Sequence, residues 1–118
     1  MSAPGGISTH VLDLARGRPA GGIAVRLERR DPKQGELWLE IASGRTDADG
    51  RAVLVAGDAP LPLGTYRLGF ELSPYFAAHA MAHFFPEAAL VFEVRVSSER
   101  HHVPLLLSPH GYSTYRGS

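Results

Sequence analysis

The stretch Tyr66-Arg67-Leu68-Gly69-Phe70-Glu71-Leu72 alternates large apolar residues with charged or small ones. Successive side chains of a β-strand point to opposite faces, so this alternation predicts a strand with one buried side and one solvent-facing side. The same period of two recurs over residues 23–28, 37–42 and 90–97. Several strands of this kind are typical of antiparallel sheets that pack on one face.

Turn-forming residues separate these runs and indicate short, closely spaced strands. Asp47-Ala48-Asp49-Gly50 predicts a tight turn into a strand over 51–56. Further strands are expected at Ile7–Leu14, at Arg100–Leu107 and, after a turn at His110-Gly111, at Tyr112–Tyr115. With about eight strands in one chain, the sequence predicts an all-β sandwich or barrel.

One segment departs from the strand pattern. Ser73-Pro74 is typical of a helix N-cap followed by proline at the first helical position. The next residues, Tyr75 to His83, are rich in alanine. We therefore expect one short helix after the fifth predicted strand, ending before Pro86.

Composition limits the classes of partner and site. The 118 residues suit a single domain spanning 1–118, in which we expect residues 1–6 to be flexible. Twelve basic and 12 acidic residues balance, which argues against nucleic acid or an anionic membrane as the main partner. The absence of cysteine excludes disulfides and thiolate chemistry. With no apparent signal peptide or membrane-spanning run, we expect a cytoplasmic protein.

Histidine is the residue type that most suggests chemistry, because imidazole titrates near neutral pH. There are six: His10, His79, His83, His101, His102 and His110. His101 and His102 are adjacent in a predicted strand, so at most one of them belongs to a site on a given face. His79 and His83 are four apart on the predicted helix, but no further ligand accompanies them, so we expect no metal. A partly exposed strand residue is the plainer interpretation of His10, and for His102 a surface or interface residue is an equally open alternative.

The turn over residues 47–50 and the residue that follows it carry three charged side chains. Arg51, at the start of a predicted strand, offers paired N–H donors to an anionic or carbonyl-rich ligand, although an ordinary edge arginine is the alternative. Asp47 and Asp49 fit turn formation better than acid–base catalysis. No nucleophile elbow, P-loop or dinucleotide glycine motif is present in the sequence.

Four separated blocks resemble the 5-hydroxyisourate hydrolases of the transthyretin-like family. The last block is the most specific: His102-Val103-Pro104-Leu105-Leu106-Leu107-Ser108 followed by Tyr115-Arg116-Gly117-Ser118. The other blocks are Ser8 to Asp13 with Gly17 to Ala20, then Thr46 to Arg51, then Ser73 to Pro86. Arg100 is a departure, because many relatives carry histidine there, and it is expected to alter local electrostatics.

The resemblance implies an eight-stranded transthyretin-like (prealbumin-like) sandwich with one short helix after the fifth strand. It also implies a homotetramer, a dimer of dimers, with the site in a cleft where the dimers meet. Transthyretin itself lacks the terminal Tyr-Arg-Gly-Ser, which favours an enzyme. Residue by residue, the family's catalytic groups fall on His10, Arg51, His102 and Ser118, and Tyr115 and Arg116 are expected to bind substrate.

The implied reaction is hydrolysis of 5-hydroxyisourate to 2-oxo-4-hydroxy-4-carboxy-5-ureidoimidazoline in urate breakdown, without a cofactor. A neutral imidazole of His10 or His102 can deprotonate water, and Arg51 can stabilise the oxyanion. Ser118 is expected to offer a hydroxyl and a terminal carboxylate. The sequence leaves open which histidine is the base. A transthyretin-like carrier without turnover and an immunoglobulin-like structural module are the alternatives.

Overall fold

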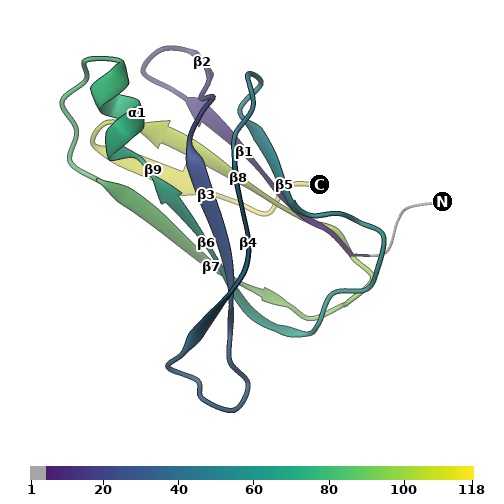
Figure 1. Ribbon diagram of the computed structural model, residues 1–118. Helices are drawn as coiled ribbons and strands as arrows, with labels where there is room; N and C mark the ends of the chain where they lie inside the picture. The colour runs from purple at the N-terminus through teal and green to yellow at the C-terminus, as the bar shows by residue number, and fades with distance from the viewer. Residues whose placement is uncertain (1–4) are drawn as a thin grey trace.

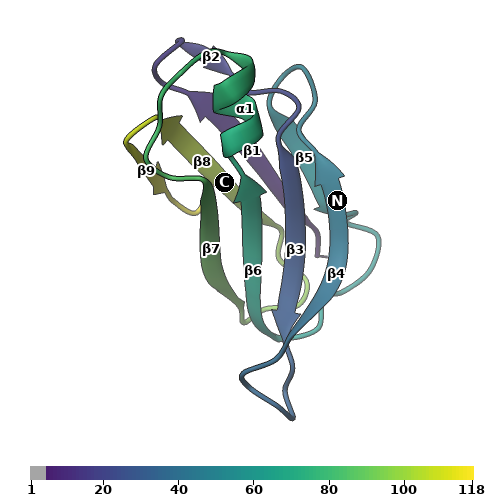
Figure 2. The ribbon, with the colours of Figure 1, turned by 60° about the vertical axis from the view of Figure 1, so that its left-hand side comes forward.

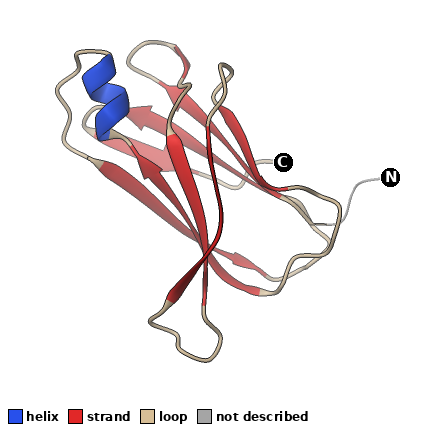
Figure 3. Ribbon diagram, viewed as in Figure 1, coloured by secondary structure: helices blue, strands red, loops and turns tan. Residues whose placement is uncertain are grey.

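A computed structural model describes residues 5–118, which form two β-sheets and one short helix (Figures 1 and 3). Within those residues the elements, in chain order, are β1 (Ile7–Asp13), β2 (Arg18–Pro19), β3 (Ala24–Arg30), β4 (Trp38–Arg45), β5 (Arg51–Val55), β6 (Gly64–Glu71), α1 (Ser73–Ala78), β7 (Glu87–Val94), β8 (His101–Ser108) and β9 (Gly111–Thr114).

The two sheets pack face to face as a sandwich. One sheet has the strand order β4-β3-β6-β7, with antiparallel neighbours throughout (Figure 2). In the other sheet the order is β2-β1-β8-β9. β5 also pairs with β1, along the first half of that strand, while β2 pairs with its end. Strands β1 and β8 are parallel, whereas β5 and β9 run antiparallel to their neighbours. This arrangement confirms the predicted all-β sandwich.

The core follows the predicted alternation most clearly in β6. Tyr66, Leu68 and Phe70 face the other sheet and are almost fully buried, while Arg67 and Gly69 point outward. In β1 and β8 the inward residues include Ile7, Val11, Leu105 and Leu107. Burial of this apolar surface is the main favourable term in folding, so the inward faces of both sheets hold the sandwich together.

Strand β4 does not keep the predicted alternation. Leu37, Leu39 and Ile41 are 45%, 40% and 46% exposed, although the sequence predicted that they share a buried face. β4 is an edge strand, and its register with β3 shifts between Leu27 and Glu28. A bulge of this kind interrupts the regular in-and-out order of side chains.

The helix is shorter than predicted and starts differently. α1 ends at Ala78, with His79 as its C-cap, so His79 and His83 do not share a helical face. The N-cap is Leu72 rather than Ser73, and the Ser73 hydroxyl instead lies 2.8 Å from His83 Nε2. With Pro74 at the helix start as predicted, the prediction of a helix was right but its length and cap were wrong.

Strand β2 is a two-residue pairing that the sequence analysis treated as a turn. Arg18 and Pro19 pair with the end of β1. Without this short element, eight strands remain and the helix follows the fifth, as predicted. Of the segment expected to be flexible, residues 1–4 lie outside the described residues, whereas Gly5 and Gly6 are buried.

Candidate active site

Three strands of one sheet present polar side chains on their outward face. β1 alternates strictly between buried and half-buried residues, so Ser8 and His10 point away from the core. The register places His10 opposite Arg51 on β5 and Ser8 opposite His102 on β8. Residues distant in the chain therefore meet on one face because β1 lies between β5 and β8.

The turn before Arg51 fixes the position of both Arg51 and His10. The Asp47 carboxylate accepts hydrogen bonds from the amides of Asp49 and Arg51, at 2.9 Å and 3.0 Å. Gly50 has a φ of 77°, and a Cβ there would collide with the carbonyl oxygen of Val11. These contacts confirm that Asp47 acts as a turn former.

His10 is anchored through one ring nitrogen. Its Nε2 lies 2.8 Å from the carbonyl oxygen of Asp49, and a carbonyl oxygen only accepts hydrogen bonds. The Nε2 of His10 therefore carries a proton and donates. In neutral His10 the basic lone pair is on Nδ1.

His102 is anchored through its other nitrogen. Its Nδ1 lies 2.8 Å from the Ser8 hydroxyl, which can donate or accept. Burial lowers the pKa of His102 below its ordinary value, and electrostatic interaction with the neighbouring His10, Arg100 and Arg51 lowers it further. The His102 imidazole is therefore held neutral and able to take a proton. Arg100 does alter the electrostatics here, as its departure from the family pattern suggested.

The C-terminal segment lies against His102. Gly117 forms an isolated antiparallel bridge with His102, and the Gly117 amide donates to the His102 carbonyl oxygen at 2.7 Å. Ser118 follows directly and is exposed. The structure thus brings His10, Arg51 and His102 to one face and runs the chain that carries Ser118 beside His102.

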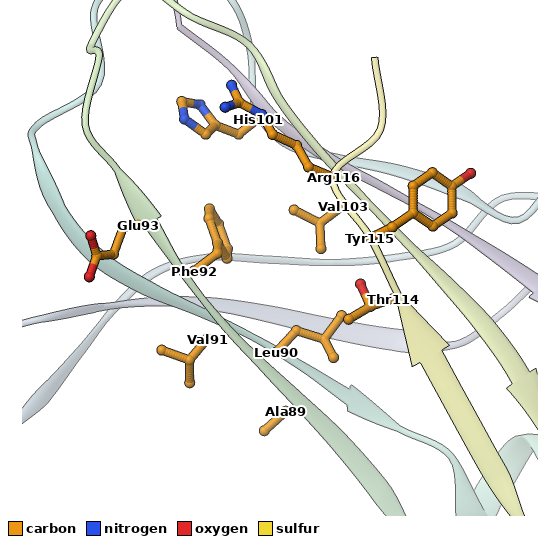
Figure 4. Close-up of a pocket in the computed structure, with 10 residues that line it drawn as sticks. All are labelled: Ala89, Leu90, Val91, Phe92, Glu93, His101, Val103, Thr114, Tyr115 and Arg116. Atoms are coloured by element: carbon orange, nitrogen blue, oxygen red, sulfur yellow. The ribbon is translucent and has the colours of Figure 1, made fainter.

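Tyr115 and Arg116 lie elsewhere, around a pocket of about 390 Å³ between β7 and β8. Figure 4 shows the Arg116 side chain reaching toward His101, while the Tyr115 ring points away from the apolar side chains of Leu90 and Phe92. Arg116 also lies 3.5 Å from the Glu99 carboxylate. Neither His10, Arg51 nor His102 lines this pocket in the single chain.

His101 and His102 face opposite sides, as predicted for adjacent strand residues. His101 is 5% exposed and packs near Phe92. Burial lowers the pKa of His101, and the Arg116 charge lowers it further, against the opposing effect of Glu99. His101 is therefore a neutral residue between the sheets rather than part of the outward face.

The other histidines give no metal site within the described residues. His79 lies 3.2 Å from an Arg16 guanidinium nitrogen, and His83 contacts Ser73. Across residues 5–118 no three His, Cys, Asp or Glu side chains gather as a metal would need. In the same range no helix has both the length and the apolar character that crossing a membrane requires.

Sequence reasoning missed two residues of this face, Ser8 and Gly117. Both lie within blocks that carried the family resemblance, next to residues that were identified. Ser8 gains importance only from the parallel register of β1 and β8. No local pattern predicts that register, because the paired residues are 94 positions apart.

Comparisons with known proteins show the family to which the chain belongs. Residues 7–117 match the model of the HIUase/Transthyretin family. A 5-hydroxyisourate hydrolase of Caulobacter vibrioides is 49% identical, covering 96% of this chain and 98% of that protein. The mouse 5-hydroxyisourate hydrolase is 38% identical, with 95% and 94% covered.

Solved structures show the same fold in a 5-hydroxyisourate hydrolase and in a transthyretin. The 5-hydroxyisourate hydrolase of Klebsiella pneumoniae superposes with a TM-score of 0.80 at 38% identity, covering 96% of this chain and 99% of that one. Transthyretin from Sparus aurata gives a TM-score of 0.83 at 29% identity, with 98% and 97% covered. By these full-length matches to hydrolases, the chain is an enzyme that belongs to the HIUase/Transthyretin family.

Proposed function

We propose that this enzyme hydrolyses 5-hydroxyisourate to 2-oxo-4-hydroxy-4-carboxy-5-ureidoimidazoline in urate degradation. The observation that carries the proposal is the meeting of His10, Arg51 and His102 on one outward face. Two imidazoles and a guanidinium supply a proton acceptor and an oxyanion donor, which are the groups that amide hydrolysis needs.

In the proposed reaction, water adds to a carbonyl carbon of the six-membered ring. A neutral histidine takes the proton from that water as the C–O bond forms. Arg51 donates to the oxygen on which negative charge develops. When the tetrahedral intermediate collapses, the ring C–N bond breaks and the protonated histidine returns its proton to the leaving nitrogen. The oxygen of the water molecule thereby ends in the new carboxylate, and one of its protons ends on the freed ureido nitrogen.

The proposed catalytic set is His10, Arg51, His102 and Ser118, with Tyr115 and Arg116 as substrate contacts. The support for Ser118 is its place directly after Gly117, which is paired with His102. Tyr115 and Arg116 are part of the same terminal block, although in the single chain they line the separate pocket. A metal is not part of the proposal, because the described residues offer no ligand cluster.

We also propose a homotetramer in which another copy closes the site. Val53, on the outward face beside Arg51, is 71% exposed. A single exposed apolar side chain does not mark an interface by itself, so the support for the tetramer is the match to the HIUase/Transthyretin family. Chromatography of the purified protein with light scattering tests this, and a monomer would refute it. The proposal further places the enzyme in the cytoplasm without nucleic-acid or membrane partners, which cell fractionation tests.

The activity is tested by generating 5-hydroxyisourate with uricase and following its ultraviolet absorbance with and without the protein. We expect much faster decay with the protein, and loss of most of the acceleration in His102→Ala with the fold retained. A transthyretin-like carrier is the second candidate, because transthyretin shares the fold at a TM-score of 0.83. Decay at the spontaneous rate with the wild-type protein would favour the carrier.

A further inference from the structure

The His102 ring is contacted along two edges by residues to which the proposed reaction has so far given no role. On one edge, the Ser8 hydroxyl lies 2.8 Å from Nδ1. Ser8 and His102 are register partners in the parallel pairing of β1 and β8, so the contact is fixed by two adjacent strands. The position of the hydroxyl is therefore set by the sheet rather than by a loop.

On the other edge, the backbone of Gly117 approaches the ring closely. A Cβ built on Gly117 would lie 2.6 Å from His102 Cδ2 and 3.3 Å from Cγ. Carbon atoms in van der Waals contact are about 3.5–4.0 Å apart, so any side chain at position 117 requires the ring or the tail to shift. Gly117 does not have a positive φ, so the need for glycine is the contact with His102 and not backbone strain.

These two contacts leave one ring nitrogen unused. Nδ1 is occupied by Ser8, and the Cδ2 edge is covered by Gly117. Within residues 5–118, the His102 ring forms a hydrogen bond with Ser8 and with no other residue. The tip of the ring, with Nε2, is the part left for a ligand.

We propose that Ser8 and Gly117 are positioning residues that hold His102 with Nδ1–H donating to Ser8 and with unprotonated Nε2 as the general base. This inference rests on the proposed function, and it decides between the two histidines in favour of His102. After Nε2 takes a proton from water, the Nδ1–H bond to Ser8 persists, so the imidazolium keeps its orientation until it returns the proton.

The positive surroundings of His102 are consistent with this role. His10 lies on β1, Arg51 on β5 and Arg100 directly before β8, and all three disfavour the imidazolium. No hydrogen bond or ion pair to a carboxylate holds His102 protonated within the described residues. Among the described residues, Ser8 is the group that hydrogen-bonds the His102 ring, and because its hydroxyl can donate or accept, the tautomer with Nδ1–H is the part of the proposal that NMR of the ring tests.

The kinetic test compares Ser8→Ala, Ser8→Thr and the control Ser43→Ala, an exposed serine on β4 of the other sheet. We expect Ser8→Ala to lower kcat about 10- to 100-fold, by analogy with the partners that orient metal-ligating histidines, with KM changed less than about twofold. Ser8→Thr restores the hydroxyl and most of kcat, and Ser43→Ala is unaffected. Wild-type kcat in Ser8→Ala, or no recovery in Ser8→Thr, would overturn the role of Ser8.

Gly117→Ala is tested against Gly111→Ala. Both glycines lie in the C-terminal segment without a positive φ, but a Cβ on Gly111 would meet only the Ser108 hydroxyl, at 4.0 Å. We expect Gly117→Ala to lower kcat at least about 10-fold and Gly111→Ala to leave it unchanged. Equal activity of the two variants would overturn the role of Gly117.

Nitrogen-15 NMR of the histidine rings, without substrate, separates this inference from the proposed function. The His102 resonances are assigned by their loss in His102→Gln. We expect protonated Nδ1 and unprotonated Nε2 in the wild type, and a shift toward protonated Nε2 in Ser8→Ala. If wild-type His102 carries its proton on Nε2, the inference is wrong even in an active enzyme. If the wild type has no turnover, the proposed function fails and the ring spectrum alone decides whether Ser8 sets the tautomer.

Discussion

Arg51 lies at an exposed position at the start of β5, opposite His10, and forms no ion pair within residues 5–118. Arg51→Ala therefore empties no core, and we expect the free energy of unfolding to change by less than about 0.5 kcal/mol. If the guanidinium stabilises the oxyanion, its loss lowers kcat by about 10²- to 10³-fold, equivalent to about 2.7–4 kcal/mol.

The same substitution has a second effect that can be measured separately. The Arg51 charge lowers the pKa of His102 because it disfavours the imidazolium. Removing that charge raises the pKa, so the acid limb of the rate profile moves to higher pH. Arg51→Lys keeps the charge but loses the paired N–H donors, so we expect reduced turnover with the acid limb nearly unmoved.

The assay is uricase-coupled decay of 5-hydroxyisourate between pH 5 and 9, with denaturation curves for each variant. Arg95→Ala is the control, because Arg95 is highly exposed and within residues 5–118 pairs only with Glu93. Turnover of Arg51→Ala within a few-fold of wild type would refute the oxyanion role. An acid limb that stays in place in Arg51→Ala would refute the electrostatic link to His102.

Three further predictions concern stability and metals. Tyr75→Phe removes the hydroxyl that donates to the buried Asp13 carboxylate at 2.6 Å, so we expect a loss of about 1.5–3 kcal/mol in urea denaturation; an unchanged midpoint would contradict it. His101 and His102 both have a folded-state pKa below the ordinary 6.5, so the unfolded state binds protons first. The free energy of unfolding in urea should therefore fall as the pH drops below about 6.5. A stability that is constant from pH 7.5 to 5 would contradict this. A strong chelator should leave turnover unchanged, because residues 5–118 contain no cluster of metal-ligating side chains. Turnover that the chelator abolishes and added zinc restores would contradict this.

The fold was predictable where side chains alternate regularly. Tyr66, Leu68 and Phe70 are buried as their spacing indicated, because the period of two directly reports which face of a strand is inside. The pattern failed in β4, where Leu39 and Ile41 are exposed on an edge strand with a register shift. It also failed for the helix length, since alanine propensity alone did not carry α1 beyond Ala78.

The candidate site was predictable from family resemblance but not from local pattern. His10, Arg51 and His102 come together only because β5, β1 and β8 are neighbours, and strand order is a long-range property. The turn at Asp47 and Gly50 was visible in sequence, and it does set the start of β5. The sequence did not predict that the carbonyl oxygen of Asp49, in this turn, accepts a hydrogen bond from His10.

A hydrolase and a transthyretin can share this fold because the two faces of a sheet are largely independent. In β1, the inward residues Ile7, Thr9 and Val11 are buried, while Ser8 and His10 point outward. Changes to the outward set leave the packing of the core almost untouched, so the same sandwich can carry different chemistry. We therefore expect substitutions at Ser8, Arg51 and Gly117 to change turnover more than they change the stability of the sandwich.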